Sequence, residues 1–336
     1  MGATNKSEDF GKRNRLLFTL LAAAFACSLS AAPAHAQRSR VFVASYGNDS
    51  NPCTFGSPCK TFQQAVNVVL AGGEVTAIDS AGFGPINITK SVTITSPDGV
   101  EAGIVPNPPT ADAIVINAGA PDAIVLRGLT LNGSGVGANG IVFNTGASLT
   151  VTNCVVQNFA GTSPNGNGIL IQPTSGILFF TITNTTVLNN ALDGISYLPP
   201  SGTPTAYGVI DHVVTNGNAY GVVIDSSSLG AGTTVVTVSN SVASENSNQG
   251  IHVDNASNTT MKVSIDNVSA STNTVGIEAS HTSNVLLGRS VITGNFDWGI
   301  SNNTSPNTFY SYGDNRINLN AIDINGSAPN TTFKTQ

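Results

Sequence analysis

Apolar and small polar residues alternate in short runs along most of this 336-residue chain. Clear cases are Leu-Thr-Val at 149–151, Val-Thr-Val at 236–238 and Val-Ser-Ile at 263–265. Alternation with a period of two, in segments rich in Val, Ile and Thr, is typical of β-strands that bury one face. The pattern therefore predicts many short strands and excludes helical repeats.

A glycine followed by an aliphatic residue returns about once per strand group, and successive glycines are 28, 26, 27, 29, 26 and 23 residues apart. A near-constant period of this length indicates stacked repeats that share one elongated core. We expect these glycines to align in one column, with each aliphatic neighbour pointing inward. The pairs are Gly140-Ile141, Gly168-Ile169, Gly194-Ile195, Gly221-Val222, Gly250-Ile251, Gly276-Ile277 and Gly299-Ile300.

Polar residues that follow the alternating strands form a second series, which ends at Arg289. Stacked amides can hydrogen-bond from one strand to the next, and Asn tolerates the left-handed conformation of tight turns. The series therefore predicts a structural ladder of buried amides at one turn, with an Asp taking the place of one amide: Asn153, Asn184, Asp211, Asn240 and Asn267. A looser series follows a few residues later in each repeat: Asn190, Asn246, Asn273 and Asn295.

The combined pattern, Val-x-Val-x-Asn-Ser-x-Val, then Asn, then x-Gly-Ile-x-Val, resembles the right-handed parallel β-helix of the pectin-lyase-like superfamily. This resemblance covers residues 75–325. It implies an all-β fold, a single-stranded right-handed parallel β-helix solenoid of about nine rungs. The superfamily includes lyases, hydrolases, epimerases, phage tailspikes and adhesins, so the resemblance does not fix the chemistry.

Residues 37–74 precede the regular repeats. A helical pattern spans Lys60–Leu70, with apolar residues on one face and Gly72-Gly73 as the expected stop. We expect this short helix to cap the open end of the core, where unpaired strand edges would favour aggregation. The start of this segment resembles that of many exported bacterial β-helix proteins of unknown role. The tail at 326–336 is polar and expected to fray.

Residues 1–36 have the features of a signal peptide. Basic residues at 12–15 precede an apolar run at 16–32, and Ala34-His35-Ala36 is a small-x-small cleavage site. No other segment is apolar for long enough to span a bilayer. The chain is therefore expected to be secreted, periplasmic or held at the cell surface.

Three cysteines remain after cleavage behind Ala36. Cys53 and Cys59 flank a short turn-rich loop, and in an exported protein this spacing predicts a disulfide. Cys154 follows Asn153 directly and is expected to be a buried, reduced thiol.

Charged residues make up only 10% of the chain, and the net charge is −6. No basic stripe is present, so nucleic acid and anionic membranes are poor partners. A polysaccharide or a cell-surface partner fits the composition better, and we expect the protein to be a monomer.

The repeat register gathers titratable groups on one outward face. Counting from each repeated glycine places Asp225, His252, Asp254 and Glu278 on neighbouring strands, with His281 at the rim. These four are the candidate catalytic residues, because two carboxylates at strand spacing suit glycoside hydrolysis. Three of them, Asp225, Asp254 and Glu278, are also candidate ligands for Ca²⁺, the one cofactor considered. The alternative is that they are simply solvated groups on an exposed strand face.

Two functions follow from these features. The first is a non-catalytic surface or extracellular protein that binds glycan or a partner, favoured because the turns near the cluster are short. The second is a carbohydrate-active enzyme, a polysaccharide lyase or glycoside hydrolase, acting at the cluster. Ile-Asp-His at 210–212 resembles a short element of pectate lyases, but the Arg base of that pattern has no counterpart here. Whether the protein is an enzyme stays open at this point.

Overall fold

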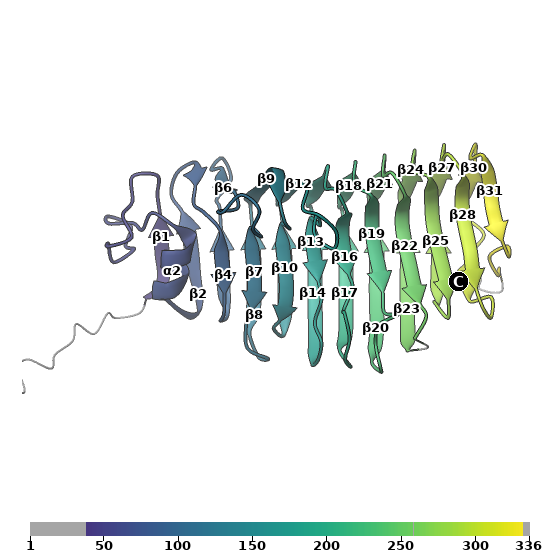
Figure 1. Cartoon of the computed structure of the whole chain (residues 1–336), viewed down its shortest axis with the longest axis horizontal. Coiled ribbons are helices and arrows are strands. Elements are labelled where there is room, and N and C mark those ends of the chain that lie inside the picture. Colours follow the sequence, from purple (N-terminus) through teal and green to yellow (C-terminus); the bar gives the residue numbers. More distant parts are fainter. Residues whose placement is uncertain (1–37, 258, 332–336) are drawn as a thin grey trace, which may run out of the picture. The chain divides into compact units, whose positions relative to one another are not determined.

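The computed structural model describes residues 38–257 and 259–331, so the predicted signal peptide lies outside the described residues. The described residues form a right-handed parallel β-helix, which confirms the predicted fold class (Figure 1). Three parallel sheets run along it, and each turn of the chain contributes one strand to each sheet in order. We call them sheets 1, 2 and 3.

Sheet 1 has 11 strands: β1 (Arg38–Val43), β2 (Val69–Ala77), β5 (Val92–Thr95), β8 (Ala123–Arg127), β11 (Ser148–Thr152), β14 (Ile177–Thr183), β17 (Thr205–Asp211), β20 (Thr233–Ser239), β23 (Thr260–Asp266), β26 (Val285–Gly288) and β29 (Phe309–Ser311). Sheet 2 has 10 strands: β3 (Ala81–Gly82), β6 (Ala102–Ile104), β9 (Leu129–Gly137), β12 (Val155–Phe159), β15 (Thr186–Leu188), β18 (Val214–Asn216), β21 (Val242–Ser244), β24 (Ser269–Ser271), β27 (Val291–Thr293) and β30 (Arg316–Asn318). Sheet 3 also has 10 strands: β4 (Ile86–Ile88), β7 (Ile114–Asn117), β10 (Ile141–Thr145), β13 (Ile169–Ile171), β16 (Asp193–Tyr197), β19 (Tyr220–Asp225), β22 (Gln249–Asn255), β25 (Val275–His281), β28 (Trp298–Thr304) and β31 (Ile322–Gly326).

The β-helix has more turns than the sequence pattern predicted. Ten strands in each of sheets 2 and 3 correspond to ten complete turns, and β1 adds an eleventh layer to sheet 1, against the nine rungs expected. The difference lies mainly in the early turns, where the glycine of the repeat is absent. Pro85 precedes Ile86 and Ala113 precedes Ile114, although both isoleucines hold the repeat position in sheet 3.

The repeated glycines align as predicted. The aliphatic residue after each one pairs with its counterpart in the next strand of sheet 3, from Ile141 through to Ile300. Close approach is the reason for glycine here. A Cβ on Gly250 would lie 2.7 Å from the carbonyl oxygen of Gly276 and 2.8 Å from Nδ2 of Asn273, and the other glycines of the column from Gly194 to Gly299 meet the same two kinds of atom.

Those amide nitrogens belong to a buried asparagine ladder between sheets 2 and 3. The looser asparagine series of the sequence forms it, joined by Asn218 and closed by Asn320. Each Nδ2 donates to Oδ1 of the next asparagine, at 2.9, 3.3, 2.9, 3.1 and 2.8 Å from Asn190 onward. Each Oδ1 also accepts the backbone N–H of the preceding ladder residue, as from Asn246 to Asn273 at 3.0 Å.

The predicted ladder occupies the turn between sheets 1 and 2, and there two expectations are wrong. The residue aligned with Asn184 and Asn240 is His212, not Asp211, because these positions share a left-handed backbone with φ near 50°. Asp211 is the last residue of β17 and pairs with Ser239. The row is also exposed rather than buried, and only Asn240 and Asn267 extend a chain of amide hydrogen bonds from Asp211.

The N-terminal end of the core is covered by α2 (Phe62–Val68) and the cysteine loop (Figure 1). The helix is shorter than predicted: the chain enters β2 at Val69, and Gly72 and Gly73 lie in that strand. Pairing of β2 with β1 outweighs the local helical pattern. Cys53 and Cys59 form a disulfide that holds the loop against β1, and Cys154 is free and buried, with its pKa raised to about 11 by burial.

At the C-terminal end, part of the polar tail is ordered. Asn330 forms backbone hydrogen bonds with Phe309 and Ser311 and so covers the last strand of sheet 1. Leu319, Ile322 and Ile324 are exposed here, in contrast to the covered N-terminal end.

The interior is apolar and contains stacked aromatic rings. Tyr197 points inward in line with Phe143 and Ile171, and it stacks on Phe180 with ring centroids 6.1 Å apart. Gly208 accommodates the Phe180 ring, since a Cβ there would lie 2.0 Å from it. No helix among residues 38–257 and 259–331 is long and apolar enough to cross a membrane.

Candidate functional site

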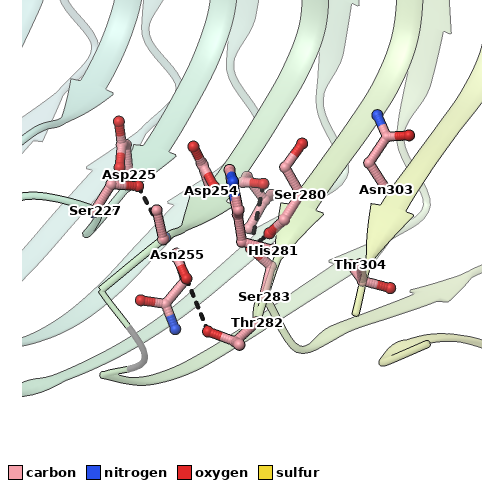
Figure 2. Close-up of polar contacts among 12 residues, drawn as sticks. Asp225, Ser227, Asp254, Asn255, Ser280, His281, Thr282, Ser283, Asn303 and Thr304 are labelled. Atoms are coloured by element: carbon pink, nitrogen blue, oxygen red, sulfur yellow. Dashed lines mark hydrogen bonds and ion pairs between the residues drawn. The ribbon is translucent and has the colours of Figure 1, made fainter. Parts of the chain in front are cut away.

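The predicted cluster lies on the outer face of sheet 3. Asp225, Asp254, Ser280 and Asn303 are in register on β19, β22, β25 and β28, and they project side by side (Figure 2). Neighbouring residues in such a column are one strand spacing apart, roughly 4.8 Å. The two aspartates are therefore close neighbours, as the repeat register required.

A second column runs beside the first. Val223, His252, Glu278 and Ser301 are in register on the same four strands, and Ser196 extends the column onto β16. The structure therefore brings all four candidate residues onto one face.

A third column contributes residues that the sequence reading missed. Asp193 pairs with Tyr220, and Gln249 occupies the same position on β22. Asp193 is almost fully buried, at 4% exposure. It directly precedes repeat glycine Gly194, where earlier turns carry Asn139 and Asn167, so reading this column along the repeats would have found it.

The side chains of the cluster contact one another. His281 Nδ1 lies 2.6 Å from Asp254 Oδ1, in the contact visible at the centre of Figure 2. His252 Nδ1 lies 3.8 Å from Glu278 Oε2, close enough for an ion pair but not for a hydrogen bond. Gln249, on the same strand as His252, donates to the same oxygen, Oε2 of Glu278. Each ionisable group of the second column is thus held by a neighbouring turn.

Asp225 is held by its own turn. Its Oδ1 accepts the backbone N–H of Ser227 at 2.7 Å, as an Asp side chain commonly does at the start of a loop. In Figure 2 this leaves the carboxylate at the edge of the face, in line with Asp254. The turn therefore fixes where the negative charge is presented.

The cluster is less exposed than predicted. Side-chain exposure is 21% at His252, 16% at Glu278 and 18% at Asp254, whereas His281 is 58% exposed. The columns of side chains shield one another, so the central residues are partly buried although they point outward.

This partial burial separates the proton affinities of the carboxyl groups. Burial raises the pKa of Asp193 to about 6, although the Ser196 hydroxyl and the His252 imidazole act in the opposite direction. The His252 imidazole lowers the pKa of Glu278, against the effect of burial. Burial acts to lower the pKa of His252, but the nearby carboxylates, Glu278 foremost, outweigh it and raise that pKa. The same face thus holds two carboxyl groups whose pKa values are shifted in opposite directions, Asp193 on β16 and Glu278 three strands away on β25.

Several buried polar atoms of this face have no hydrogen-bond partner. They are Ser196 Oγ, Gln249 Oε1 and His252 Nδ1. Such atoms are rare in folded proteins because each loses its hydration without compensation. In the described residues the other unpartnered buried side-chain atoms are on Tyr197 and Thr234, whose side chains point into the core. Three of the five buried side-chain atoms without a hydrogen-bond partner in the described residues therefore lie on the outer face of sheet 3.

The calcium candidates do not assemble into a metal centre. Within residues 38–257 and 259–331, no group of three or more His, Cys, Asp and Glu side chains is placed to hold a metal ion. Asp225, Asp254 and Glu278 instead each bind a different protein group, as described above.

Hollows of the surface also lie away from the cluster. One of about 590 Å³ is lined by residues of sheet 1 and its turn, including Asp266, Arg289 and Tyr312. Arg289 there forms an ion pair with Asp266. Asp211 and His212, the pair that resembles a pectate lyase element, also lie on this side, with His212 Nδ1 2.6 Å from Asp211 Oδ2. They are therefore separate from the sheet 3 cluster, where the chemistry is concentrated on an open face.

Comparisons with known proteins support the fold class. No protein-family model matches the chain, and no curated protein matches it. Three chains of solved structure match. One, described as the complex structure of XylC with xylose, has a TM-score of 0.54 at 9% identity and covers 78% of this chain and 68% of its own. Another, the crystal structure of pectate lyase Pel9A, has a TM-score of 0.48 at 16% identity and covers 88% and 81%.

The chain thus has the parallel β-helix fold that the sequence pattern predicted. At such low identity the likeness concerns the fold alone, and one fold of this kind carries many activities. Function has to be argued from the sheet 3 face.

Proposed function

We propose that this is an exported protein that binds carbohydrate chains along the outer face of sheet 3 without cleaving them. The observation that carries the proposal is the register of Asp225, Asp254, Ser280 and Asn303, which presents one hydrogen-bonding side chain per turn. A ligand made of repeating units can meet such a row unit by unit. Carbohydrate recognition depends on dense hydrogen bonding of this type.

The openness of the face favours binding over catalysis. The loops that leave the four strands of the cluster have seven residues at 198–204 and at 226–232, four at 256–259 and three at 282–284. Loops of this length do not build the enclosed cleft that removes water from a reacting bond. An open face instead admits the middle of a long chain.

Export is supported by two features. The first 36 residues have the sequence of a signal peptide, and Cys53 and Cys59 are joined by a disulfide. Disulfides persist mainly in oxidising compartments such as the periplasm and the cell exterior.

The direct test is binding by the mature chain, residues 37–336, to a panel of soluble polysaccharides in affinity electrophoresis. We expect retardation by at least one polysaccharide, and weaker retardation of the double variant Asp225→Asn/Asp254→Asn. The matched control is Asp98→Asn/Glu101→Gln, which removes two exposed carboxylates far from sheet 3. Equal retardation of parent and double variant, or none by any polysaccharide, would contradict the proposal.

One observation favours the second candidate, a carbohydrate-active enzyme. Asp225 and Asp254 are in register on adjacent strands, one strand spacing of roughly 4.8 Å apart, which is close to the separation of the two carboxyl groups in retaining glycosidases. New reducing ends or unsaturated products from the same panel would establish activity. Their disappearance in the single variants Asp225→Asn and Asp254→Asn, with polysaccharide binding retained, would assign it to this pair.

A further inference from the structure

Charge is unevenly divided among the three sheets. None of the ten strands of sheet 3, all of which lie among the described residues, contains Lys or Arg. Sheet 1 holds Arg38, Arg40, Arg127 and Lys262, and sheet 2 holds Arg316. A ligand that approaches sheet 3 therefore meets no permanent positive charge on its strands.

Negative charge is concentrated on four adjacent strands of sheet 3. Asp193, Asp225, Asp254 and Glu278 lie on β16, β19, β22 and β25. We call the outer surface of these four strands the acidic face. Its two histidines offset the charge only in part, since His281 is already paired with Asp254 and His252 with Glu278. Like charge across an interface is strongly unfavourable, so this face repels carboxylate-bearing glycans.

Unpartnered polar atoms give an independent indication of a ligand. Ser196 has 0% exposure, and its Oγ projects into the acidic face between Leu170 and Val223, where it lies near Asp193 without forming a hydrogen bond of normal geometry. Gln249 Oε1, an obligate acceptor, is also unpartnered. Asp225 and Asp254 each use only Oδ1 in the contacts described above, which leaves Oδ2 of both to accept from a ligand, and a protonated amine supplies three donors and no acceptor.

On the basis of the proposed function, we infer that the acidic face selects amine-bearing glycans, whose sugars carry a protonated amino group, over uncharged and uronate glycans. The ammonium group would lie over the row of Asp225 and Asp254, whose carboxylates are one strand spacing apart. Charge-assisted hydrogen bonds to carboxylates are about twice as strong as neutral ones. The selectivity therefore comes from the charge of the ligand and not from the shape of the face.

The test compares oligosaccharides that differ only in the amine. Glucosamine oligomers, N-acetylglucosamine oligomers of the same length and galacturonate oligomers are titrated into the mature protein by calorimetry at low salt. A pH of about 6 keeps the amines protonated, because it lies below the usual pKa of an α-amino group. We expect glucosamine oligomers to bind about tenfold more tightly than the acetylated ones, galacturonate to bind weakest, and added salt to reduce the difference.

Substitutions then locate the selectivity. Asp225→Asn/Asp254→Asn should bring glucosamine and N-acetylglucosamine oligomers close to parity, while Asp98→Asn/Glu101→Gln should keep the preference. Thermal denaturation of both variants checks that they fold. Binding of glycans without preference for the amine, or with preference for galacturonate, overturns this inference and leaves the proposed function standing. Failure to bind any of the three oligomers overturns the inference too, and the polysaccharide panel then decides the proposed function separately.

Discussion

Two rows of side chains repeat once per turn through the C-terminal half of the β-helix, and both are rich in asparagine. The buried ladder, from Asn190 to Asn320, lies between sheets 2 and 3, and its members from Asn190 to Asn295 are at most 2% exposed. The turn row, from Asn153 to Arg289, lies between sheets 1 and 2 and faces solvent. The same residue type at the same period is therefore used in two environments.

The physical reasons for asparagine differ between the rows. In the buried ladder each amide supplies a hydrogen-bond partner to backbone groups as well as to the next amide. Nδ2 of Asn246, for example, donates both to the Thr215 carbonyl and to Asn273. In the turn row the requirement is the backbone, since Asn153, Asn184, Asn240 and Asn267 all have φ between 48° and 54°. Asn tolerates this left-handed region better than most residues. A row of asparagines therefore stabilises the fold through its hydrogen bonds only where water cannot compete for them.

The largest difference between the rows should appear when an amide is replaced by an alkyl chain. Asn246→Leu leaves the buried backbone N–H of Asn218 without a partner, and it removes the side-chain hydrogen bonds that Asn246 makes with Nδ2 of Asn218 and with the Thr215 carbonyl. We expect it to lower the free energy of unfolding by about 3 kcal/mol, because each unmet buried group costs about 1–3 kcal/mol.

The counterpart in the turn row, Asn240→Leu, should cost about 1 kcal/mol, from backbone strain in the left-handed region. Urea denaturation of both variants measures the two costs. Equal losses of stability would mean that the rows are not distinct in the way argued here.

The glycine column should depend on the buried ladder. Gly250→Ala places a methyl group 2.8 Å from Nδ2 of Asn273 and 2.7 Å from the Gly276 carbonyl oxygen, and we expect a loss of about 2 kcal/mol. Gly82→Ala is the control, because a Cβ on this β3 residue meets nothing within 4 Å.

Combining Gly250→Ala with Asn273→Ala removes one of the two colliding atoms. The cost of the double variant should then be smaller than the sum of the two single costs, as expected for residues in contact. Strict additivity would show that the glycine is required for another reason.

The fold was predictable because it rests on a repeated requirement. Seven glycines at near-constant spacing mark seven places where only a hydrogen fits, and the alternating residues around them can bury only one face. The turns before Gly140 lack this mark, which is why their number was underestimated. The length of α2 was missed because pairing with β1 determines where Val69 leaves the helix, and that partner is distant in sequence.

The candidate site was predictable in position but not in environment. Register alone placed Asp225, His252, Asp254 and Glu278 together, since outward residues of parallel strands stack. Asp193 was missed because its column carries different residues in successive turns. Its raised pKa depends on burial among neighbours from other turns. The sequence did not show that the turn position belongs to His212 and not to Asp211. The Asp211 carboxylate accepts the hydrogen bond from the Asn240 amide, although His212 occupies the turn position.

A smaller effect distinguishes strain from hydrogen bonding within the turn row. Asn240→Ala should cost about 1 kcal/mol, whereas Asn240→Gly should cost only a few tenths, since glycine adopts a φ of +48° without strain. Both variants lose the hydrogen bonds to Asp211 and Asn267 equally. If the denaturation midpoint falls by the same amount in both variants, the hydrogen bonds of the exposed amides do stabilise the fold.

The smallest expected effect concerns the carboxylate on which that exposed chain begins. The Ser239 hydroxyl, followed by His212 and Asn240, lowers the pKa of Asp211 to about 2, against a smaller opposing effect of burial. A carboxyl whose folded pKa lies below its unfolded value of about 4 stabilises the fold above that value and loses the contribution as pH falls toward 2. Because Asp211 is partly exposed, we expect less than about 1 kcal/mol. Asp211→Asn should therefore flatten the stability profile between about pH 4 and pH 2 relative to the parent. If the stability of the parent is equally flat over this pH range, solvent screens the charge of the turn row completely. The turn row would then differ even more from the buried ladder, which contains no group that titrates.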